Sequence, residues 1–346
     1  MLIARAPLRI SLAGGGTDLH AYYSRFGGMV VSTTIDKHVY VIVSPNEGRH
    51  IQVSSSDYRC FFRNGVDEPA RVDGDLKLPK AVLGRFGIRS GLSILLASQV
   101  PPGTGLGSSS AVAVALTKAL SVLCGQRMTS GEVAELACEI EIDELGMPIG
   151  RQDQYAAAFG GLRCYEFTRE GVRTERLDVT AATLAALEER LMLFFTPSHH
   201  DSGEILAEQR HNCATGVPDA LDALHVIREI AQRTRRDLLA GDVSRVGEGL
   251  HESWMAKRRL ARGISHPRID GWYELAREAG ATGGKIAGAG GGGFLLLHCE
   301  PDRQDGVSEA LRRSGLVRMD FRMESGGAMV IVNHLAGAVA AVGAGV

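Results

Sequence analysis

The chain has 346 residues, a length that predicts two domains rather than one or four. Hydrophobic residues make up 45% and charged residues 23%, an ordinary balance that excludes a disordered chain or a coiled coil. With 38 Lys and Arg against 40 Asp and Glu, the formal net charge is −2. The composition therefore gives no electrostatic reason to bind nucleic acid or an anionic membrane.

The compartment is predicted from apolar runs and cysteines. No apolar run approaches the ~20 residues that span a bilayer, and Arg5 and Arg9 interrupt the apolar start that a secretory signal would need. The six cysteines are scattered without a CxxC pair, which favours reduced thiols over a zinc site or a disulfide framework. We expect a cytoplasmic protein with no membrane or nucleic-acid partner, and residues 336–346 as a loose tail without chemistry.

The first half reads as strand-rich. β-branched and alternating residues predict strands over 2–12, 29–43, 50–54 and 91–100. The last of these ends at a Pro-Pro-Gly turn, and helices are predicted over 111–124 and, after a Ser cap, over 130–145.

Near residue 180 the pattern changes to helices of 3.6-residue period, over 181–190, 220–239 and 243–261. A glycine loop running into a strand, a helix over 302–313 and closing strands over 317–322 and 328–332 follow. The expected architecture is α+β in two domains, 1–180 and 181–335, followed by the tail.

A first glycine loop, PPGTGLGSSS at 101–110, lies between a predicted strand and helix. Its glycines let backbone N–H groups converge, and the helix start adds free donors and a positive dipole end, which together suit phosphate. The serines could cap the helix, bond phosphate or ligate Mg²⁺, and the alternative is a tight turn with serine caps. No Lys follows as in a Walker A loop, and Ser108 replaces the third glycine of a Rossmann fingerprint.

A second glycine loop covers 283–293, where seven of eleven residues are Gly. Each glycine costs about 0.5–1 kcal/mol relative to Ala in regular structure, so packing alone would need few of them. The run predicts a backbone that closes on a ligand or on the first loop.

A third glycine-rich turn follows the first strand and ends in Thr17-Asp18. Within that strand Arg9 stands between Leu8 and Ile10, and a buried Arg needs an anionic partner. Asp18 could cap a helix beginning at Leu19 or accept hydrogen bonds from sugar hydroxyls, and the two roles are compatible.

Three loops with these contents in this order resemble the GHMP kinase superfamily of galactokinase, homoserine kinase and mevalonate kinase. PPGTGLGSSSA and KIAGAGGGGF carry the resemblance. RAPLRISLAGGGTD, GRQDQYAAAFGGL and GGKIAGAGGGGFLLL look most like the bacterial sugar 1-kinases that act on D-glycero-D-manno-heptose 7-phosphate. Galactokinase-like proteins have Glu-His where this chain has Gly15-Gly16, which argues against galactose.

The resemblance implies a ribosomal-S5-like N-terminal domain, a ferredoxin-like C-terminal domain and a transfer of phosphate from ATP to the anomeric hydroxyl of the heptose 7-phosphate. The alternatives are a kinase for an unphosphorylated sugar such as fucose and a nucleotide-binding relative without turnover. Sugar phosphate and ATP are the expected partners. A homodimer stays open, because no residue pattern selects or excludes one.

The resemblance also assigns roles to residues. Asp153 matches the catalytic aspartate, although alone it would read as a cap of a helix over 154–159, and Arg9 matches the basic residue that assists the attacking hydroxyl. Mg²⁺ is expected on Ser109 and Glu141, the latter otherwise one of several acids on a solvated helix face with Glu139, Asp143 and Glu144. The residues expected around the ATP phosphates are Pro102, Gly103, Thr104, Gly105, Leu106, Gly107, Ser108, Ser109 and Ser110.

The substrate-binding residues expected are Asp18, Gly15, Gly16, Gly290, Gly291 and Lys257. Other candidate cations for the substrate phosphate are Arg258, Arg259, Lys37 and Arg151, each of which would otherwise be a solvated surface charge. His199-His200-Asp201 stands where relatives often carry an Arg, and it lacks a third well-spaced ligand for a metal site.

Overall fold

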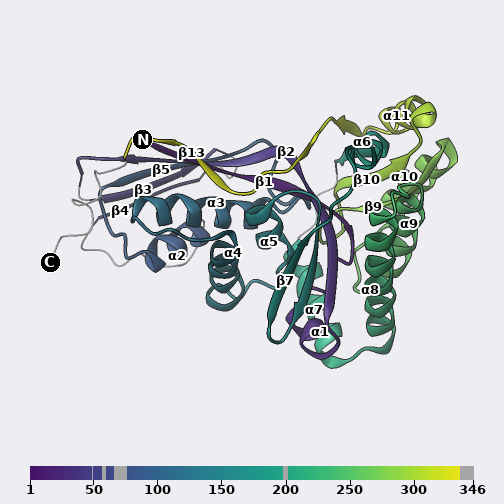
Figure 1. The fold of residues 1–346 in the computed structure, drawn as a ribbon, viewed down its shortest axis with the longest axis horizontal. Coiled ribbons are helices and arrows are strands. Elements are labelled where there is room, and N and C mark those ends of the chain that lie inside the picture. Colours follow the sequence, from purple (N-terminus) through teal and green to yellow (C-terminus); the bar gives the residue numbers. More distant parts are fainter. Residues whose placement is uncertain (49, 57–59, 66–75, 198–201, 336–346) are drawn as a thin grey trace.

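The computed structural model describes residues 1–48, 50–56, 60–65, 76–197 and 202–335. Two β-sheets flanked by helices make up this part of the chain, one at each end of the long axis in Figure 1. This mixed architecture confirms the α+β prediction. The predicted tail at 336–346 and the sequence His199-His200-Asp201 lie outside the described residues.

The first sheet contains nine strands among the described residues, and the long strand β2 (Gly28–Pro45) organises it. The early part of β2 pairs with β6 (Arg163–Thr168), and its later part pairs with β5 (Leu92–Ser98). The other strands in this sheet are β1 (Leu2–Ala13), β3 (His50–Ser55), β4 (Cys60–Gly65), β7 (Gly171–Arg176), β12 (Met323–Glu324) and β13 (Met329–Asn333).

Helices cover one face of this sheet in Figure 1. They are α2 (Lys77–Arg85), α3 (Ser108–Leu123), α4 (Ser130–Cys138) and α5 (Gln152–Phe159). Helix α3 packs on β1 and β2, and its alanines, among them Ala111, Ala115 and Ala119, are fully buried. Because Ala has a short side chain, the helix axis approaches the sheet closely and its first turn is held firmly beside β1.

The second sheet is antiparallel, in the order β11 (Val317–Met319), β8 (Leu191–Thr196), β10 (Gly293–Cys299) and β9 (Ala281–Ile286). Every residue of β10 is buried. The helices of this half are α6 (Ala181–Arg190), α8 (Pro218–Leu239), α9 (Arg245–Lys257), α10 (Pro267–Ala279) and α11 (Gln304–Arg313). Two more helices, α1 (His20–Phe26) and α7 (Ser202–Thr215), contact each other at the lower end of Figure 1.

The last strands return to the first sheet. Strand β12 pairs with β2, and β13 pairs with β1. The Glu324 carboxylate fixes this return, since it lies 2.9 Å from Arg5 Nη2 and 2.7 Å from His38 Nε2. Of the closing strands predicted from sequence, the earlier one therefore completes the second sheet and the later one completes the first.

Two predicted boundaries are wrong for physical reasons. The helix expected over 130–145 changes at Glu139 to a π-helix that ends at Glu144. Gly283 and Gly284, expected in a loop, lie within β9. A Cβ on Gly283 would stand 1.8 Å from the carbonyl oxygen of Gly247 in α9, so this glycine allows a helix to lie directly on the strand.

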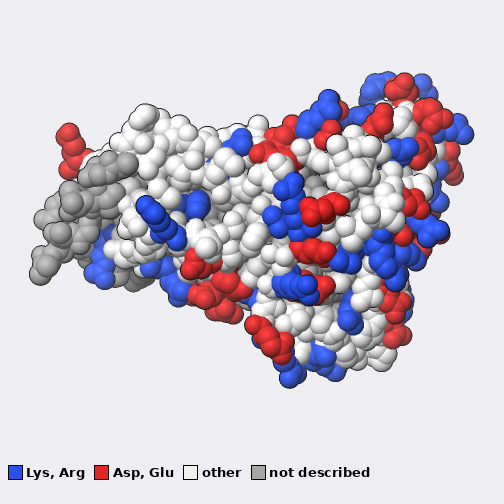
Figure 2. Space-filling view, viewed as in Figure 1, with Lys and Arg blue, Asp and Glu red and all other residues white. Residues whose placement is uncertain are grey.

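Charged side chains of both signs are interspersed on the face shown in Figure 2, mostly over the half that contains α8 to α11. That face therefore carries no extended field of one sign. Among the described helices, none combines the length and the apolar character of a bilayer-spanning segment.

The two glycine loops meet backbone to backbone between the sheets. A Cβ on Gly105 would lie 2.4 Å from the carbonyl oxygen of Ala287, and one on Gly288 would lie 2.4 Å from the Cα of Gly105. The amide of Phe294 also donates to the carbonyl of Thr104 at 3.2 Å. The second loop thus closes on the first, as the glycine content predicted.

This contact predicts different consequences for two glycines of one loop. Gly103 (φ +74°) and Gly105 (φ +85°) both have left-handed backbone, but a Cβ at Gly103 would meet no atom within 4 Å. Gly103→Ala should lose about 1–2 kcal/mol of unfolding free energy from backbone strain alone. Gly105→Ala should lose clearly more, because it also pushes the loops apart. Urea denaturation of both variants measures the difference, and equal losses would contradict the close approach.

Candidate active site

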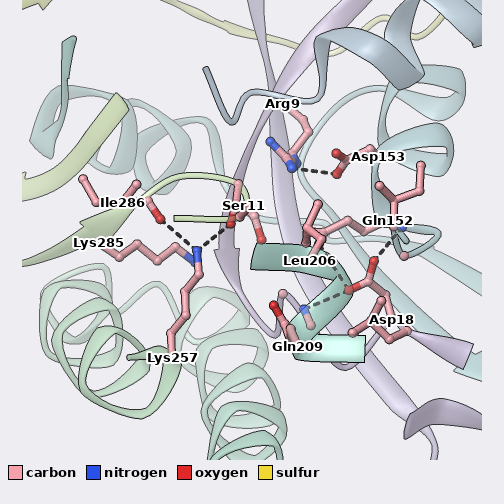
Figure 3. A pocket seen from close by; sticks show the side chains of 17 residues that line it. Arg9, Ser11, Asp18, Gln152, Asp153, Leu206, Gln209, Lys257, Lys285 and Ile286 are labelled. Atoms are coloured by element: carbon pink, nitrogen blue, oxygen red, sulfur yellow. Dashed lines mark hydrogen bonds and ion pairs between the residues drawn. The ribbon is translucent and has the colours of Figure 1, made fainter. Parts of the chain in front are cut away.

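Arg9 joins strand β1 to the first glycine loop, residues 101–110. It is only 4% exposed, and its backbone amide donates to the carbonyl of Leu106 at 3.1 Å. Nη1 donates to the carbonyl of Gly105 at 2.6 Å, and Nη2 lies 2.7 Å from Oδ1 of Asp153. Figure 3 shows the guanidinium directed at that carboxylate. The anionic partner that a buried Arg requires is therefore Asp153.

Asp153 stands in the first turn of α5 and is a quarter exposed. The helix is capped at Arg151 without a side-chain cap bond, so the helix-cap interpretation of Asp153 is wrong. A Cβ on Gly107 would come within 3.3 Å of Oδ2 of Asp153. The Asp153 carboxylate thus lies directly against the first glycine loop.

The first glycine loop leads into α3 through Gly107, which has a left-handed backbone and caps the helix without any side-chain bond. The serines at 108–110 therefore do not cap the helix by a side chain. Ser109 Oγ instead donates to Oε1 of Glu141 at 3.0 Å. The N–H groups of a sixteen-residue helix are left available to an anion at this end.

Glu141 is fully buried on the π-helix. Gln154 Nε2 donates to its second oxygen at 2.7 Å, and burial raises the pKa of the carboxyl to about 7. The neighbouring acids Glu139 and Glu144 instead form ion pairs with Arg85 at the surface. Burial and its bonds to Ser109 and Gln154 therefore distinguish Glu141 from the neighbouring acids, which the sequence alone could not do.

A divalent cation fits the Ser109–Glu141 pair. One carboxylate and one hydroxyl are oxygen ligands of the kind Mg²⁺ prefers, and Mg²⁺ commonly completes its shell with phosphates and water. Among the described residues there is no cluster of three or more His, Cys, Asp or Glu that could hold a metal alone. The pair is suited to a cation that arrives with phosphate.

Asp18 is buried and lies between the third glycine turn and α5. Its carboxylate accepts hydrogen bonds from the amide of Gly16 at 2.9 Å, the amide of Gln152 at 3.1 Å and Nε2 of Gln152 at 3.2 Å. Burial raises the pKa of this carboxyl above its ordinary value, and the N–H groups oppose that shift. Helix α1 has Leu19 at its cap position and no side-chain cap, so Asp18 ties the turn to α5 instead.

Two lysines, Lys285 buried and Lys257 partly buried, converge on the same space in Figure 3. Lys257 Nζ donates to the carbonyl of Ile286 at 3.1 Å and to that of Gly288, and Lys285 Nζ donates to the carbonyl of Leu12 at 3.2 Å. Burial lowers the pKa of Lys257 to about 7, and burial with two neighbouring cations lowers that of Lys285 further from its ordinary range. In the described part of the chain neither ammonium has a carboxylate partner, so an anionic ligand would complete this cluster.

A cavity brings several of these groups together, although Glu141 and the expected ATP-binding residues 102–110 are not among those that line it. Of the residues that the sequence singled out, its wall contains Arg9, Gly15, Gly16, Asp18, Asp153 and Lys257. Sequence reasoning missed four other polar members of the wall, which are Ser11, Gln152, Gln209 and Lys285. Lys285 is the one charged residue of the second glycine loop, at 283–293. An isolated cation in a glycine-rich backbone was the signal that could have identified it.

The second glycine loop contributes different residues from those expected. Gly288 and Ala289 line the cavity. Gly291 donates its amide to the carbonyl of Ile264 at 2.9 Å, and a Cβ on Gly290 would stand 2.9 Å from the Cα of Ile264. The structure therefore places Gly290 and Gly291 in packing contacts and not in the cavity wall.

The remaining candidate cations are paired elsewhere. Each one forms an ion pair with a carboxylate and none lines the cavity: Lys37 with Asp36, Arg151 with Glu135, Arg258 with Asp270, and Arg259 with Asp219.

Comparison with known proteins matches both halves of the chain. The GHMP kinases N terminal domain matches residues 76–161, and the GHMP kinases C terminal domain matches residues 234–316. A D-glycero-alpha-D-manno-heptose 7-phosphate kinase of Campylobacter jejuni is 32% identical, over 92% of this chain and 95% of that protein. The mevalonate kinase of Thermococcus sibiricus is 27% identical over 91% of this chain and 93% of that protein.

Solved structures agree. A D-glycero-D-manno-heptose 1-phosphate kinase from Bacteroides thetaiotaomicron superposes with a TM-score of 0.80 at 28% identity, over 96% of this chain and all of that one. The mevalonate kinase of Methanococcus jannaschii shares the fold, with a TM-score of 0.71 at 17% identity, 93% of this chain and 98% of that one being covered. The chain belongs to the GHMP kinase family. It is accordingly an ATP-dependent phosphotransferase.

The lowered pKa of Lys257 predicts how stability depends on pH. Between about pH 7 and the ordinary Lys pKa of 10.5, the unfolded chain binds a proton that the folded chain lacks, so this group makes the unfolding free energy rise with pH. Relative to Lys257→Met, the unaltered protein should gain about 1 kcal/mol or less per pH unit above pH 7. Urea denaturation across that range measures the difference. Lys37→Met, at a partly buried ion pair with Asp36, is the control. A constant difference for Lys257→Met would contradict the role of burial.

Proposed function

We propose that the chain transfers the γ-phosphoryl group of ATP to the anomeric hydroxyl of D-glycero-D-manno-heptose 7-phosphate, giving the 1,7-bisphosphate. The names of two relatives support a heptose phosphate as substrate, although one names the 7-phosphate and the other the 1-phosphate. A sugar already phosphorylated at its anomeric oxygen has no hydroxyl there. Transfer to that position therefore goes with the 7-phosphate.

The observation that carries the proposal is the Arg9–Asp153 pair, which lines a polar cavity and lies against the first glycine loop. Besides Asp153 Oδ1, which is ion-paired with Arg9, three buried polar atoms of the same wall have no hydrogen-bond partner among the described residues: Arg9 Nε, Ser11 Oγ and Gln152 Oε1. Buried polar atoms are normally bonded, so these atoms call for a ligand rich in hydroxyl groups. A sugar has that chemistry.

The transfer follows from this placement. Asp153 accepts the proton of the anomeric hydroxyl as its oxygen bonds to the γ-phosphorus, and the bond from that phosphorus to the bridging oxygen of ADP breaks. Arg9 stabilises negative charge on the attacking oxygen, and the N–H groups of residues 103–110 stabilise charge on the phosphates. Positioning and charge neutralisation are the main requirements of phosphoryl transfer.

Mg²⁺ belongs to the proposal as the cation that Ser109 and Glu141 would hold, where it would offset charge on the ATP phosphates. Lys257 and Lys285, close enough to Arg9 for the three positive charges to influence one another, gather at the reacting end of the cavity. There they would face the transferred phosphoryl group.

The second candidate is a kinase for an unphosphorylated sugar such as fucose. It is supported by a 24% identical L-fucokinase/L-fucose-1-P guanylyltransferase of Bacteroides fragilis, of which only 34% is covered. A nucleotide-binding relative without turnover is disfavoured, because the proton acceptor and its Arg partner are both in place. The buried, unpaired thiols of Cys138, Cys164 and Cys213 support a cytoplasmic location.

Removing the proton acceptor tests the proposed chemistry. Asp153→Asn should lower kcat for heptose 7-phosphate by roughly 10²–10⁴-fold, because the side chain keeps its shape and loses its basic oxygen. The measurement is an ADP-coupled assay, with Asp178→Asn as an exposed control outside the catalytic cavity. Undiminished turnover by Asp153→Asn would show that Asp153 is not the proton acceptor. If the unaltered protein prefers fucose, galactose or mannose in the same assay, heptose 7-phosphate is not its substrate.

Removing a cation ligand tests the Mg²⁺ site. Glu141→Gln and Ser109→Ala should each raise the Mg²⁺ concentration for half-maximal rate at least roughly 10-fold, because each loses an oxygen ligand. Glu139→Gln is the matched control, since Glu139 is an exposed acid on the same π-helix. An unchanged Mg²⁺ requirement in both variants would place the cation elsewhere.

A further inference from the structure

The proposed substrate has a second anionic group at the end of the sugar remote from the anomeric hydroxyl. The cations of the catalytic cavity are gathered near Asp153, whereas the distal phosphate needs cations farther along the same space. Arg151, Arg258 and Arg259 are already bound to carboxylates. Another positively charged surface connected to the cavity is therefore required.

A groove beside the catalytic cavity has the right position. It lies between α1, α7 and the segment that follows α4, and we call it the α1–α7 groove. Leu19 and Ile149 line both the groove and the cavity. The groove therefore adjoins the cavity at these two apolar side chains, on the side where a ligand that extends from Asp153 would reach it.

The charge of the groove also fits. Arg25 of α1 and Arg210 of α7 line it, together with His20 and His211, against a single carboxylate, that of Asp143. Among the described residues neither Arg has an ion-pair partner. The Arg25 guanidinium lies 4.8 Å from the centre of the Phe26 ring, a contact that holds it without neutralising its charge.

Unpaired arginines distinguish this groove from the surroundings of the site. The planar guanidinium fork matches two phosphate oxygens at once, and such charge-assisted bonds are stronger than neutral ones. We infer that the α1–α7 groove holds the distal phosphate of the sugar, with Arg25 and Arg210 as its ligands. The inference rests on the proposed function and names the part of the chain that selects a phosphorylated sugar.

The groove is remote from the reacting atoms, so its contacts with the phosphate are equally strong before and during transfer. Binding of that kind lowers KM and leaves kcat nearly unchanged. An unphosphorylated heptose makes no use of these contacts. The two arginines should therefore affect one substrate and not the other.

The experiment compares Arg25→Gln, Arg210→Gln and the double variant on heptose 7-phosphate and on the unphosphorylated heptose. For the phosphorylated sugar, each single variant should raise KM roughly 10- to 100-fold with kcat little changed. The KM of the unphosphorylated sugar should stay the same. Arg210→Lys should recover part of the affinity, because it restores the charge and not the fork.

Arg268→Gln is the matched control, since Arg268 is an exposed arginine 4.8 Å from the Trp272 ring and lines neither the groove nor the cavity. An unchanged KM for the phosphorylated sugar, or equal rises for both sugars, would overturn the groove assignment while the proposed function stands. No turnover of heptose 7-phosphate by the unaltered protein would overturn the proposed function, and the groove assignment with it.

Discussion

The buried guanidinium of Arg9 is the constraint on which the rest of the site depends. A charge that is 4% exposed needs partners, and it finds them in the carbonyl of Gly105 and the carboxylate of Asp153. Both partners must come close to the first strand. The first glycine loop does so because Gly105 and Gly288 pack backbone to backbone, and α5 does so because Asp18 holds the amide of Gln152. Satisfying one charge therefore aligns all three glycine-rich segments.

The cations around the site fall into two groups that differ in their ion-pair partners. Those at the surface are paired with carboxylates, as Arg258 is with Asp270. Of those that line the cavity or the groove, Arg9 is paired with Asp153, whereas the lysines and the groove arginines have no carboxylate partner among the described residues. Burial lowers the pKa of Lys257 to about 7. A site that leaves buried charge uncompensated gives up stability in the free protein and recovers it when an anion binds. Phosphorylated substrates would supply such anions, both in the catalytic cavity and in the α1–α7 groove.

Sequence could predict what depends on local pattern. The first strand, the helix at 181–190 and the need of Arg9 for an anion were all evident from neighbouring residues. It could not separate Glu141 from Glu139, because their difference arises from a π-helix and from Gln154, thirteen positions away. Nor could it tell that Gly283 admits a helix onto a strand, or that Gly290 packs on Ile264. Those roles are set by partners distant in sequence, which periodicity does not record.

The proposed transfer can be tested by a crystal structure with Mg²⁺, a non-hydrolysable ATP analogue and heptose 7-phosphate. We expect the γ-phosphate on the N–H groups of residues 103–110, and the anomeric hydroxyl within hydrogen-bond distance of Asp153. A triphosphate bound away from that loop, or a sugar whose anomeric hydroxyl points away from the Arg9–Asp153 pair, would contradict it.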